Sequence, residues 1–327
     1  MRRCLTIAEE LRAHGAKIFF ACRTESFPVE KFLENIATGW EEYDWNLTPE
    51  EDAQKVVDSS RRFRVDSVIV DHYRANEAYQ KILYDSGLRW LQFDGAALWP
   101  CWADWVLNIS PAASEGLYEG LRRRKETRFL MGTQYAPLRR EFRESRTRET
   151  QDKEGRAVLL TFGGGDDRGA TIFCLGAIQG LGVDADVTVL LSSANPRMDA
   201  ILNWDQYNQN RIRVVVDAEM PARFMASADM AIAAGGMTVF ELAALGIPVM
   251  ILQIADNQVP IARAWQERGY GINMGYMGRL QPQDLQWELI ALMRDAGRRK
   301  AMSTVGKQMV DGLGAQRVAE ALLAAGV

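Results

Sequence analysis

A strand-like run that leads through two glycines into a helical pattern is the feature of this sequence most suited to chemistry. It lies in residues 228–246, ADMAIAAGGMTVFELAALG, with Gly235 and Gly236 at the turn. The backbone N–H groups of Gly236, Met237 and Thr238 would then open the helix. Such N–H groups, together with the positive end of the helix dipole, attract phosphate groups. We interpret this turn as a diphosphate site, and a purely structural turn is the alternative.

Glu241 lies one turn into the same helical pattern. Its carboxylate could accept hydrogen bonds from the hydroxyls of a ribose. The structural alternative is that this acidic side chain complements the positive end of the helix dipole.

A second glycine-rich turn consists of Gly163, Gly164 and Gly165, which follow a predicted strand and precede a predicted helix. We include Gly163 and Gly164 in the candidate binding site. Asp166 and Asp167 come next, and we expect their negative charges to repel a phosphate held close by. A role in shaping the site is therefore as well supported as direct contact, because glycines are common in turns from strand to helix.

The third candidate loop is Asp256, Asn257 and Gln258, between a predicted strand and a predicted helix at 259–268. Asp256 is a competent N-cap residue. The side-chain amides of Asn257 and Gln258 could recognise a base or a sugar. Capping and ligand binding are equally supported here.

Asp71, His72 and Tyr73 follow the β-branched run at 65–70, which is typical of a buried parallel strand. At the carboxyl end of such a strand these side chains could supply a general base or bind a sugar. The alternative is a buried histidine with a structural role. We treat all three as candidate catalytic residues.

The composition excludes several classes of function. The 327 residues include 39 basic and 43 acidic side chains, so a net charge of -4 predicts no binding to nucleic acid. Two histidines and four cysteines without a CxxC pair predict no metal site. Charged residues interrupt the N-terminal segment, and glycines, Glu241 and Pro248 interrupt the most apolar stretch, so we expect neither a secretion signal nor a membrane span. We therefore expect a cytoplasmic protein.

The predicted strands and helices alternate through both halves of the chain, which is typical of an α/β protein. We expect two doubly wound Rossmann-type domains facing a cleft, with the first at 1–145 and the second at 146–327. The boundary falls in RESRTRETQDKEGR at 143–156, which lacks large apolar side chains. The predicted strands lie at 17–22, 65–70, 88–93, 105–108, 128–131, 157–162, 187–191, 212–216, 230–233 and 249–252.

Segments along nearly the whole chain resemble the hydrolase of the pseudaminic-acid pathway, which has a GT-B fold and removes UDP from a UDP-linked diacetamido-trideoxy-altropyranose. They are MRRCLTIAEELRAHG, VIVDHY, SEGLYEGL, RFLMGTQYAPLRREF, LLTFGGGDD, ADMAIAAGGMTVFELAALGIP and ADNQVPIA. The Gly-Gly-x-Thr turn with its following Glu is shared by many GT-B glycosyltransferases, whereas TQYAPLRREF and ADNQVPIA are more discriminating.

This resemblance implies that the first domain binds the sugar and carries out catalysis, and that the second binds UDP. Gly236, Met237 and Thr238 would hold the diphosphate, and Glu241 the ribose. The amides of Asn257 and Gln258 would line the nucleotide-sugar pocket, and Tyr73 would face the sugar. The implied reaction is attack of water at the anomeric carbon with inversion and release of UDP, without a metal, and we expect no cofactor.

The family also has a Gly-x-Gly-His loop after its first strand, and the resemblance implies that this histidine is the catalytic base. The present sequence begins after that position, so we expect the first strand of the N-terminal domain to be missing. One strand plus its loop corresponds to roughly fifteen residues. His72 or Asp71 would then be the stand-in base. Two alternatives are a glycosyltransferase that uses a UDP-sugar donor and a catalytically silent protein that binds nucleotide sugars.

Overall fold

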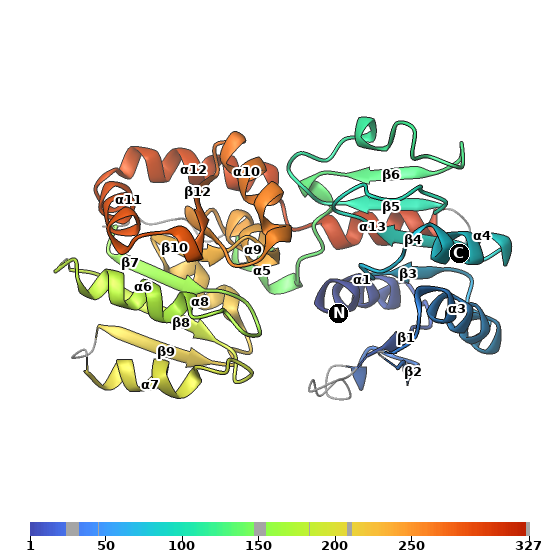
Figure 1. Ribbon diagram of the computed structural model, residues 1–327, viewed down its shortest axis with the longest axis horizontal. Helices are drawn as coiled ribbons and strands as arrows, with labels where there is room; N and C mark the ends of the chain where they lie inside the picture. The colour runs from blue at the N-terminus through green and yellow to red at the C-terminus, as the bar shows by residue number, and fades with distance from the viewer. Residues whose placement is uncertain (24–32, 45, 147–154, 183, 208–210, 325–327) are drawn as a thin grey trace. The chain divides into compact units, whose positions relative to one another are not determined.

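The computed structural model describes residues 1–23, 33–44, 46–146, 155–182, 184–207 and 211–324 (Figure 1). The chain divides into two compact units. Unit 1 comprises residues 1–138 and 313–327, and unit 2 comprises residues 139–312. The first boundary between the units lies at 138/139, whereas the predicted one lies at 145/146. In addition, the last segment of the chain returns to unit 1.

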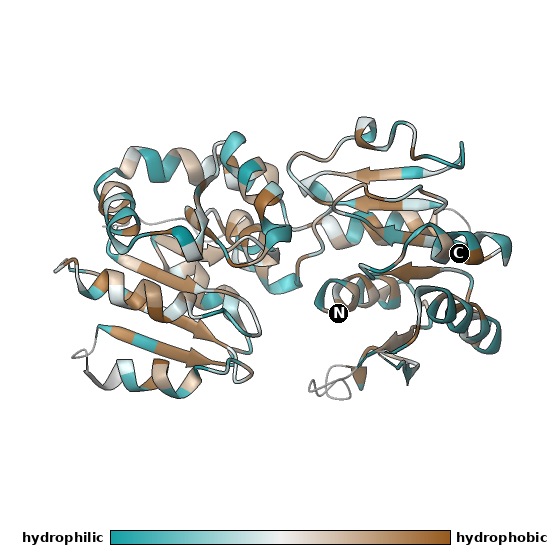
Figure 2. Ribbon diagram, viewed as in Figure 1, coloured by the Kyte–Doolittle hydropathy of each residue, from teal (hydrophilic) through white to brown (hydrophobic). Residues whose placement is uncertain are grey.

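Unit 2 is built on a six-stranded parallel sheet in the order β12-β11-β10-β7-β8-β9. Its strands are β7 (Ala157–Thr161), β8 (Asp186–Leu191), β9 (Ile212–Val216), β10 (Met230–Ala234), β11 (Val249–Gln253) and β12 (Gly271–Tyr276). All five residues of β10 and of β11 are buried. Burial on both faces explains why β10 and β11 are continuous apolar runs in the sequence. Figure 2 shows the mostly apolar colouring of β7, β8 and β9 in the same sheet.

The helices of unit 2 connect these strands and carry the apolar residues that cover the sheet. They are α5 (Arg140–Ser145), α6 (Ala170–Gln179), α7 (Met198–Tyr207), α8 (Pro221–Ser227), α9 (Met237–Leu245), α10 (Val259–Glu267), α11 (Pro282–Arg294) and α12 (Ala296–Met309). Short 3-10 turns, η3 (Asp256–Gln258) and η4 (Met277–Arg279), precede α10 and follow β12.

Unit 1 contains a four-stranded parallel sheet in the order β3-β4-β5-β6. Its strands are β3 (Val68–Val70), β4 (Trp90–Phe93), β5 (Trp105–Asn108) and β6 (Arg128–Met131). The helices of this unit are α1 (Arg2–Ala13), α3 (Pro49–Phe63), α4 (Glu77–Asp85) and α13 (Gly314–Leu323), with 3-10 turns η1 (Glu115–Tyr118) and η2 (Thr133–Tyr135). The start of α3 is fixed by a capping box between Thr48 and Glu51, with Pro49 in its first turn.

A separate parallel pair, β1 (Phe19–Cys22) and β2 (Gly39–Glu42), completes the described strands of unit 1. Figure 1 shows this pair beyond β3. Within the described part of the chain, no strand pairs with β1 on the side away from β2, or with β3 on the side away from β4. Residues of β1 and β3 are partly exposed, whereas β4 and β5 are fully buried. Among the described residues, the strands of unit 1 therefore form two separate sheets.

The helix α13 is the element that carries the chain back to unit 1. It packs against α1 and η2. A Cβ added at Gly314 would collide with the backbone carbonyl of Ala136, so the glycine permits this close approach. Among the described helices, none is long and apolar enough to cross a membrane.

Candidate functional site

The order of strands in unit 2 defines where a ligand would bind. From β7 the chain proceeds outward through β8 and β9, and it then returns to the other side of β7 to form β10, β11 and β12. The strand order therefore reverses between β7 and β10. In open α/β sheets ligands bind at such a switch point, outside the carboxyl ends of the strands. The loops that follow β7 and β10 are the two glycine-rich turns of the sequence.

The two glycines of the loop after β10 differ in their surroundings. A Cβ added at Gly235 would lie 3.1 Å from Cβ of Gln258, so this glycine permits contact with the loop after β11. A Cβ added at Gly236 would meet open space, and the φ of Gly236 is -112°. Neither packing nor backbone conformation requires a glycine at position 236. Its N–H donates a hydrogen bond to the carbonyl of Ala234 at 2.8 Å, while the space on the Cβ side of Gly236 is open.

Gly236 is the N-cap residue of α9, and no side chain caps this helix. Met237 and Thr238 form its first turn and are partly exposed. An uncapped helix N-terminus leaves N–H donors that an anion can satisfy. The strand, the two glycines and the start of the helix lie where the sequence analysis placed them. Phosphate binding at this turn stays a prediction.

The two aspartates of the loop after β7 are held by different partners. Asp167 is only 2% exposed, and its carboxylate accepts hydrogen bonds from two backbone N–H groups at the start of α6, at 2.9 and 3.0 Å. Asp166 accepts a hydrogen bond from the backbone of Arg168 at 2.8 Å and pairs with Arg197 at 2.6 Å. These interactions, the backbone hydrogen bond first, lower the pKa of Asp166. The charge of Asp166 is thus paired with that of Arg197, whereas Asp167 is held by backbone N–H groups alone. The expected repulsion of a phosphate stays a prediction.

Glycine geometry in the same loop is consistent with a tight turn. Gly163 has a φ of +96°, a conformation that favours glycine, and an added Cβ would meet open space at Gly163 and at Gly165. Gly164 lies between them in the same bend. Arg168, which follows the aspartates, donates a hydrogen bond to the hydroxyl of Tyr276 at 3.3 Å. The sequence analysis assigned no role to Arg168 or Arg197.

The third loop, after β11, forms the 3-10 turn η3. Asp256 does not cap α10, because the N-cap residue of that helix is Gln258, without a side-chain hydrogen bond to the helix. Asp256 and Asn257 are exposed. The side-chain oxygen of Gln258 accepts a hydrogen bond from the backbone of Ile254 at 2.9 Å. Local structure thus engages this oxygen of Gln258, whereas Asn257 is accessible to a ligand.

Glu241 lies in α9, and its side chain is 16% exposed. Its Oε1 lies 3.9 Å from Nη2 of Arg139, whose Nη1 pairs with Glu141 at 2.8 Å. Arg139 belongs to the sequence TQYAPLRREF, which we had singled out without assigning any residue in it. A local motif does not reveal this contact, because 102 positions separate Arg139 from Glu241 in the sequence.

In unit 1, Asp71 follows β3 directly and is paired with Arg3 of α1. Nε of Arg3 donates to Oδ2 of Asp71 at 2.7 Å, and Nη2 donates to Oδ1. Burial raises the pKa of Asp71, but the hydrogen bonds and the charge of Arg3 outweigh this effect and lower it. A carboxylate with a lowered pKa and two bonds to a guanidinium is a weak proton acceptor.

His72 and Tyr73 differ sharply in exposure. Tyr73 is 84% exposed, so its ring is accessible to a ligand. His72 is largely buried and contacts Arg23 and Asp52, neither of which the sequence analysis predicted. Asp52 is one of the few buried acidic residues of the described chain, with 4% exposure.

The structure thus brings the candidate residues together in two groups. The three loops of unit 2 lie at the carboxyl edge of one sheet, and Gly235 touches the loop that contains Gln258. Asp71, His72 and Tyr73 lie at the carboxyl end of β3 in unit 1.

No family model matches the chain. Over 219 residues it is 26% identical to the spore coat polysaccharide biosynthesis protein SpsG of Bacillus subtilis, covering 65% of this chain and 64% of that protein. Over 259 residues it is 24% identical to an uncharacterized protein of Methanocaldococcus jannaschii, covering 76% of this chain and 51% of that protein. The chain thus spans less than two thirds of the length of these relatives.

Solved structures share the fold over nearly the whole chain. MurG of Acinetobacter baumannii has a TM-score of 0.70 at 14% identity, covering 99% of this chain and 95% of that one. The UDP-GlcNAc 2-epimerase of Neisseria meningitidis, solved with bound UDP-GlcNAc, has a TM-score of 0.67 at 14% identity, covering 98% and 96%. The chain therefore has the GT-B fold with two Rossmann-like domains, as the sequence predicted.

Proposed function

We propose that this protein binds a UDP-sugar and hydrolyses it to UDP and the free sugar. The sugar of the proposal is the diacetamido-trideoxy sugar of the pseudaminic-acid pathway. The observation that carries the proposal is the uncapped N-terminus of α9 at the switch point of the unit 2 sheet, with open space above Gly236. Relatives and structural neighbours that act in polysaccharide synthesis or on UDP-sugars support it.

In the proposed complex Gly236, Met237 and Thr238 hold the diphosphate, with the N–H groups of Met237 and Thr238 as donors. The N–H of Gly236 donates to the carbonyl of Ala234 at 2.8 Å in the structure and would have to leave it to reach the diphosphate. The carboxylate of Glu241 accepts hydrogen bonds from the ribose hydroxyls, and Asn257 and the amide of Gln258 contact the nucleotide sugar. Tyr73 contacts the sugar. No membrane or nucleic-acid partner enters the proposal, and the site of action is the cytoplasm.

The proposed reaction forms a bond between a water oxygen and the anomeric carbon and breaks the bond from that carbon to the diphosphate oxygen. The electron pair leaves with UDP, and the water proton passes to a base. Donors fixed at the N-terminus of α9 would stabilise the charge that develops on the leaving diphosphate without a metal. This preorganised stabilisation is the part of the reaction that unit 2 would supply.

The test is incubation of the purified protein with the UDP-linked diacetamido sugar, with UDP-GlcNAc as the comparison substrate. Release of UDP and free sugar in equal amounts, without an added acceptor, supports hydrolysis. Release of UDP only when a hydroxylated acceptor is present, with formation of a glycoside, identifies a glycosyltransferase instead. Binding of UDP without turnover identifies a catalytically silent binding protein, and absence of UDP binding overturns all three.

The silent alternative has a specific observation in its favour. The carboxylate of Asp71 is engaged by Arg3, and His72 is engaged by Arg23. Each candidate base of unit 1 therefore already has a protonated partner in the structure.

A further inference from the structure

Three side chains from separate segments of unit 1 meet beside the carboxyl ends of β1 and β3. Nη1 of Arg23 lies 2.6 Å from Nε2 of His72, and Nη2 of Arg23 lies 3.1 Å from Oδ2 of Asp52. The same carboxylate oxygen of Asp52 lies 3.5 Å from Nε2 of His72. All three side chains are largely buried, with exposed fractions of 11% for Arg23, 6% for Asp52 and 19% for His72.

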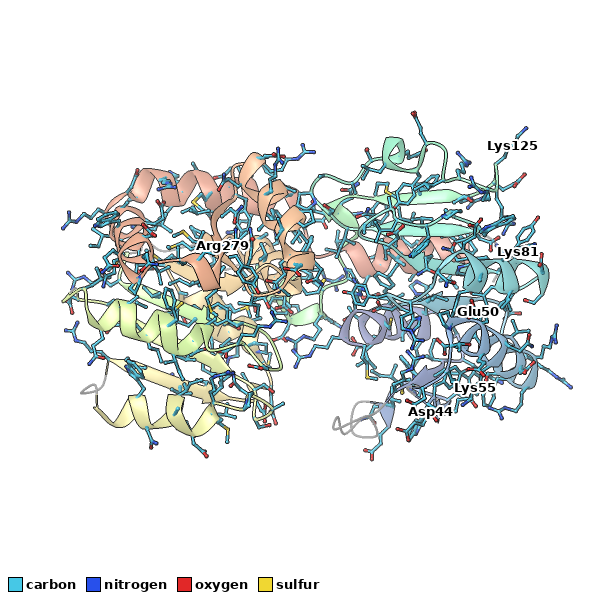
Figure 3. All side chains as sticks on the ribbon, in the orientation of Figure 1. Asp44, Glu50, Lys55, Lys81, Lys125 and Arg279 are labelled. Carbon is cyan, nitrogen blue, oxygen red and sulfur yellow. The ribbon has the colours of Figure 1, made fainter. Side chains whose placement is uncertain are left out.

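The backbone also anchors Arg23. Its Nε donates a hydrogen bond to the carbonyl of Asp44, the residue labelled near β2 in Figure 3, at 3.3 Å. The guanidinium therefore has contacts in three directions: hydrogen bonds to the carbonyl of Asp44 and to His72, and an ion pair with Asp52. A side chain held in this way gives its Nη1 a fixed position against the imidazole ring.

The distance between Arg23 and His72 determines which ring nitrogen carries the proton. A guanidinium is protonated at any pH at which a protein is folded, and it has no acceptor. At 2.6 Å its N–H must point at a lone pair, so Nε2 of His72 is unprotonated. A neutral imidazole with its lone pair on Nε2 carries its proton on Nδ1. In the described part of the chain, Nδ1 of His72 is buried and has no hydrogen-bond partner.

We propose that Arg23 and Asp52 are positioning residues that hold His72 in its Nδ1-protonated form, so that the ring is a hydrogen-bond donor and not the base that activates water. Asp52 acts through Arg23. Its carboxylate fixes the guanidinium, and the guanidinium donates a hydrogen bond to the lone pair on Nε2 of His72. The statement about the tautomer stands on the geometry alone. The statement about water rests on the proposed function.

The charges around the ring favour the neutral form. Burial lowers the pKa of His72, the carboxylate of Asp52 opposes this effect, and the positive charges of Arg23 and Arg74 add to it, while Asp71 raises the pKa slightly. The ring of Tyr79, from α4, completes the surroundings at 5.8 Å between ring centroids. The net direction is a lowered pKa, so the ring is neutral at pH 7.

The experiment is nitrogen-15 NMR of the imidazole rings. The chain has two histidines, and His14 is the exposed C-cap residue of α1, so a His14→Gln variant leaves His72 as the single signal. We expect long-range proton–nitrogen correlations at pH 8 to show a protonated Nδ1 and an unprotonated Nε2. A protonated Nε2 in this protein overturns the proposal.

Replacement of Arg23 tests the cause. In Arg23→Met the lone pair of Nε2 loses its donor and Asp52 becomes an acceptor for the ring. We therefore expect the proton to move to Nε2 and the pKa of His72 to rise toward or above its ordinary value of 6.5. Arg23→Lys keeps a charged donor and should retain the Nδ1-protonated form. An unchanged tautomer in Arg23→Met overturns the role of Arg23.

A matched control removes an arginine–carboxylate pair elsewhere. Arg156→Met breaks the exposed pair with Asp184 in unit 2 and should leave the His72 signal unchanged. In Asp52→Asn the guanidinium of Arg23 loses the charge that fixes it, so we expect part of the ring population to carry its proton on Nε2 and the pKa of His72 to fall further. An unchanged tautomer in Asp52→Asn overturns the role of Asp52. A protein that shows the expected tautomer but releases no UDP refutes the proposed hydrolysis alone, and one that hydrolyses the UDP-sugar with Nε2 protonated refutes this inference alone.

Discussion

Replacing Gly236 with alanine tests the proposed diphosphate site with little effect on the fold. The added Cβ meets open space, and the glycine has φ -112° and ψ -156°, an extended conformation that alanine also adopts. Alanine is less favourable than glycine as an N-cap residue, but it reduces the conformational freedom of the unfolded chain. These effects oppose each other, so we expect the free energy of unfolding to change by less than about 1 kcal/mol.

The expected effect on UDP binding is much larger. The methyl group would occupy the space through which a diphosphate oxygen reaches the backbone N–H groups at the start of α9. Loss of one hydrogen bond to a charged group costs about 1.5 to 3 kcal/mol. Since about 1.4 kcal/mol corresponds to a factor of ten, we expect the Kd for UDP to rise about 10- to 150-fold.

Titration calorimetry with UDP measures this change, and urea unfolding measures stability in parallel. Gly95→Ala is the matched control, because an added Cβ at Gly95 in unit 1 also meets open space. This control should bind UDP like the unaltered protein. If Gly236→Ala binds UDP with unchanged affinity while the unaltered protein binds it well, the diphosphate does not lie at this helix N-terminus.

Three further predictions concern other parts of the two units. Glu241→Ala should weaken UDP binding by about 1.5 to 3 kcal/mol in calorimetry through loss of a charged ribose acceptor, whereas Glu241→Gln, which keeps an acceptor oxygen, should lose less; equal affinities in all three proteins would remove Glu241 from the site. The pKa of Asp71 is lowered in the folded protein, so its stabilising effect is complete above the unfolded pKa near 3.8 and is lost as the pH falls through the folded value. Asp71→Asn should therefore lower the free energy of urea unfolding by about 1.5 to 3 kcal/mol at pH 7 but by much less near pH 2, and an equal loss at both pH values would contradict this. Amides of the two-stranded pair β1-β2 should exchange with deuterium faster than those of β4 and β5, because an isolated pair of strands is marginally stable, and equal protection would contradict a divided sheet.

Much of the fold of unit 2 could be predicted because its parallel strands are buried on both faces. Such strands are short apolar runs between turn residues, and the observed β7 to β11 coincide with the predicted runs within one residue at each end. The sequence analysis missed β12, in which Gly271, Asn273 and Gly275 interrupt the apolar pattern. The sequence of β12 therefore does not look like a buried strand. Its hydrogen bonds to β11 identify it as one in the structure.

The return of α13 to unit 1 could not be predicted from local pattern. The amphipathic pattern of α13 predicts that one face of the helix is buried. The pattern does not indicate which domain that face packs against. The close contact of Gly314 with Ala136 joins residues 178 positions apart. A boundary read from composition therefore finds the polar segment at 143–156 and misses the second crossing near 312.

The same reasoning applies to the candidate site. The turn at Gly235 and Gly236 was predictable because strand, glycines and helix are adjacent in the sequence. The partners of Asp71 and His72 were not, because Arg3 and Arg23 precede them by 68 and 49 positions. Ion pairs of this kind depend on which segments the fold brings together. The spacing of residues within a short motif does not predict this.

The charge arrangement in the two units separates the two halves of the proposed reaction. In unit 2 the N-terminus of α9 has no side-chain cap, Asp166 is paired with Arg197, and Asp167 is held by backbone N–H groups. In unit 1 each candidate base is already bound to an arginine. In the proposed reaction unit 2 would stabilise the leaving diphosphate at the N-terminus of α9. Asp71 and His72, in contrast, can accept a proton only after breaking a bond to a guanidinium. It follows that UDP binding should depend on α9 and be insensitive to His72, and that any turnover should have a pH dependence set by a group other than His72.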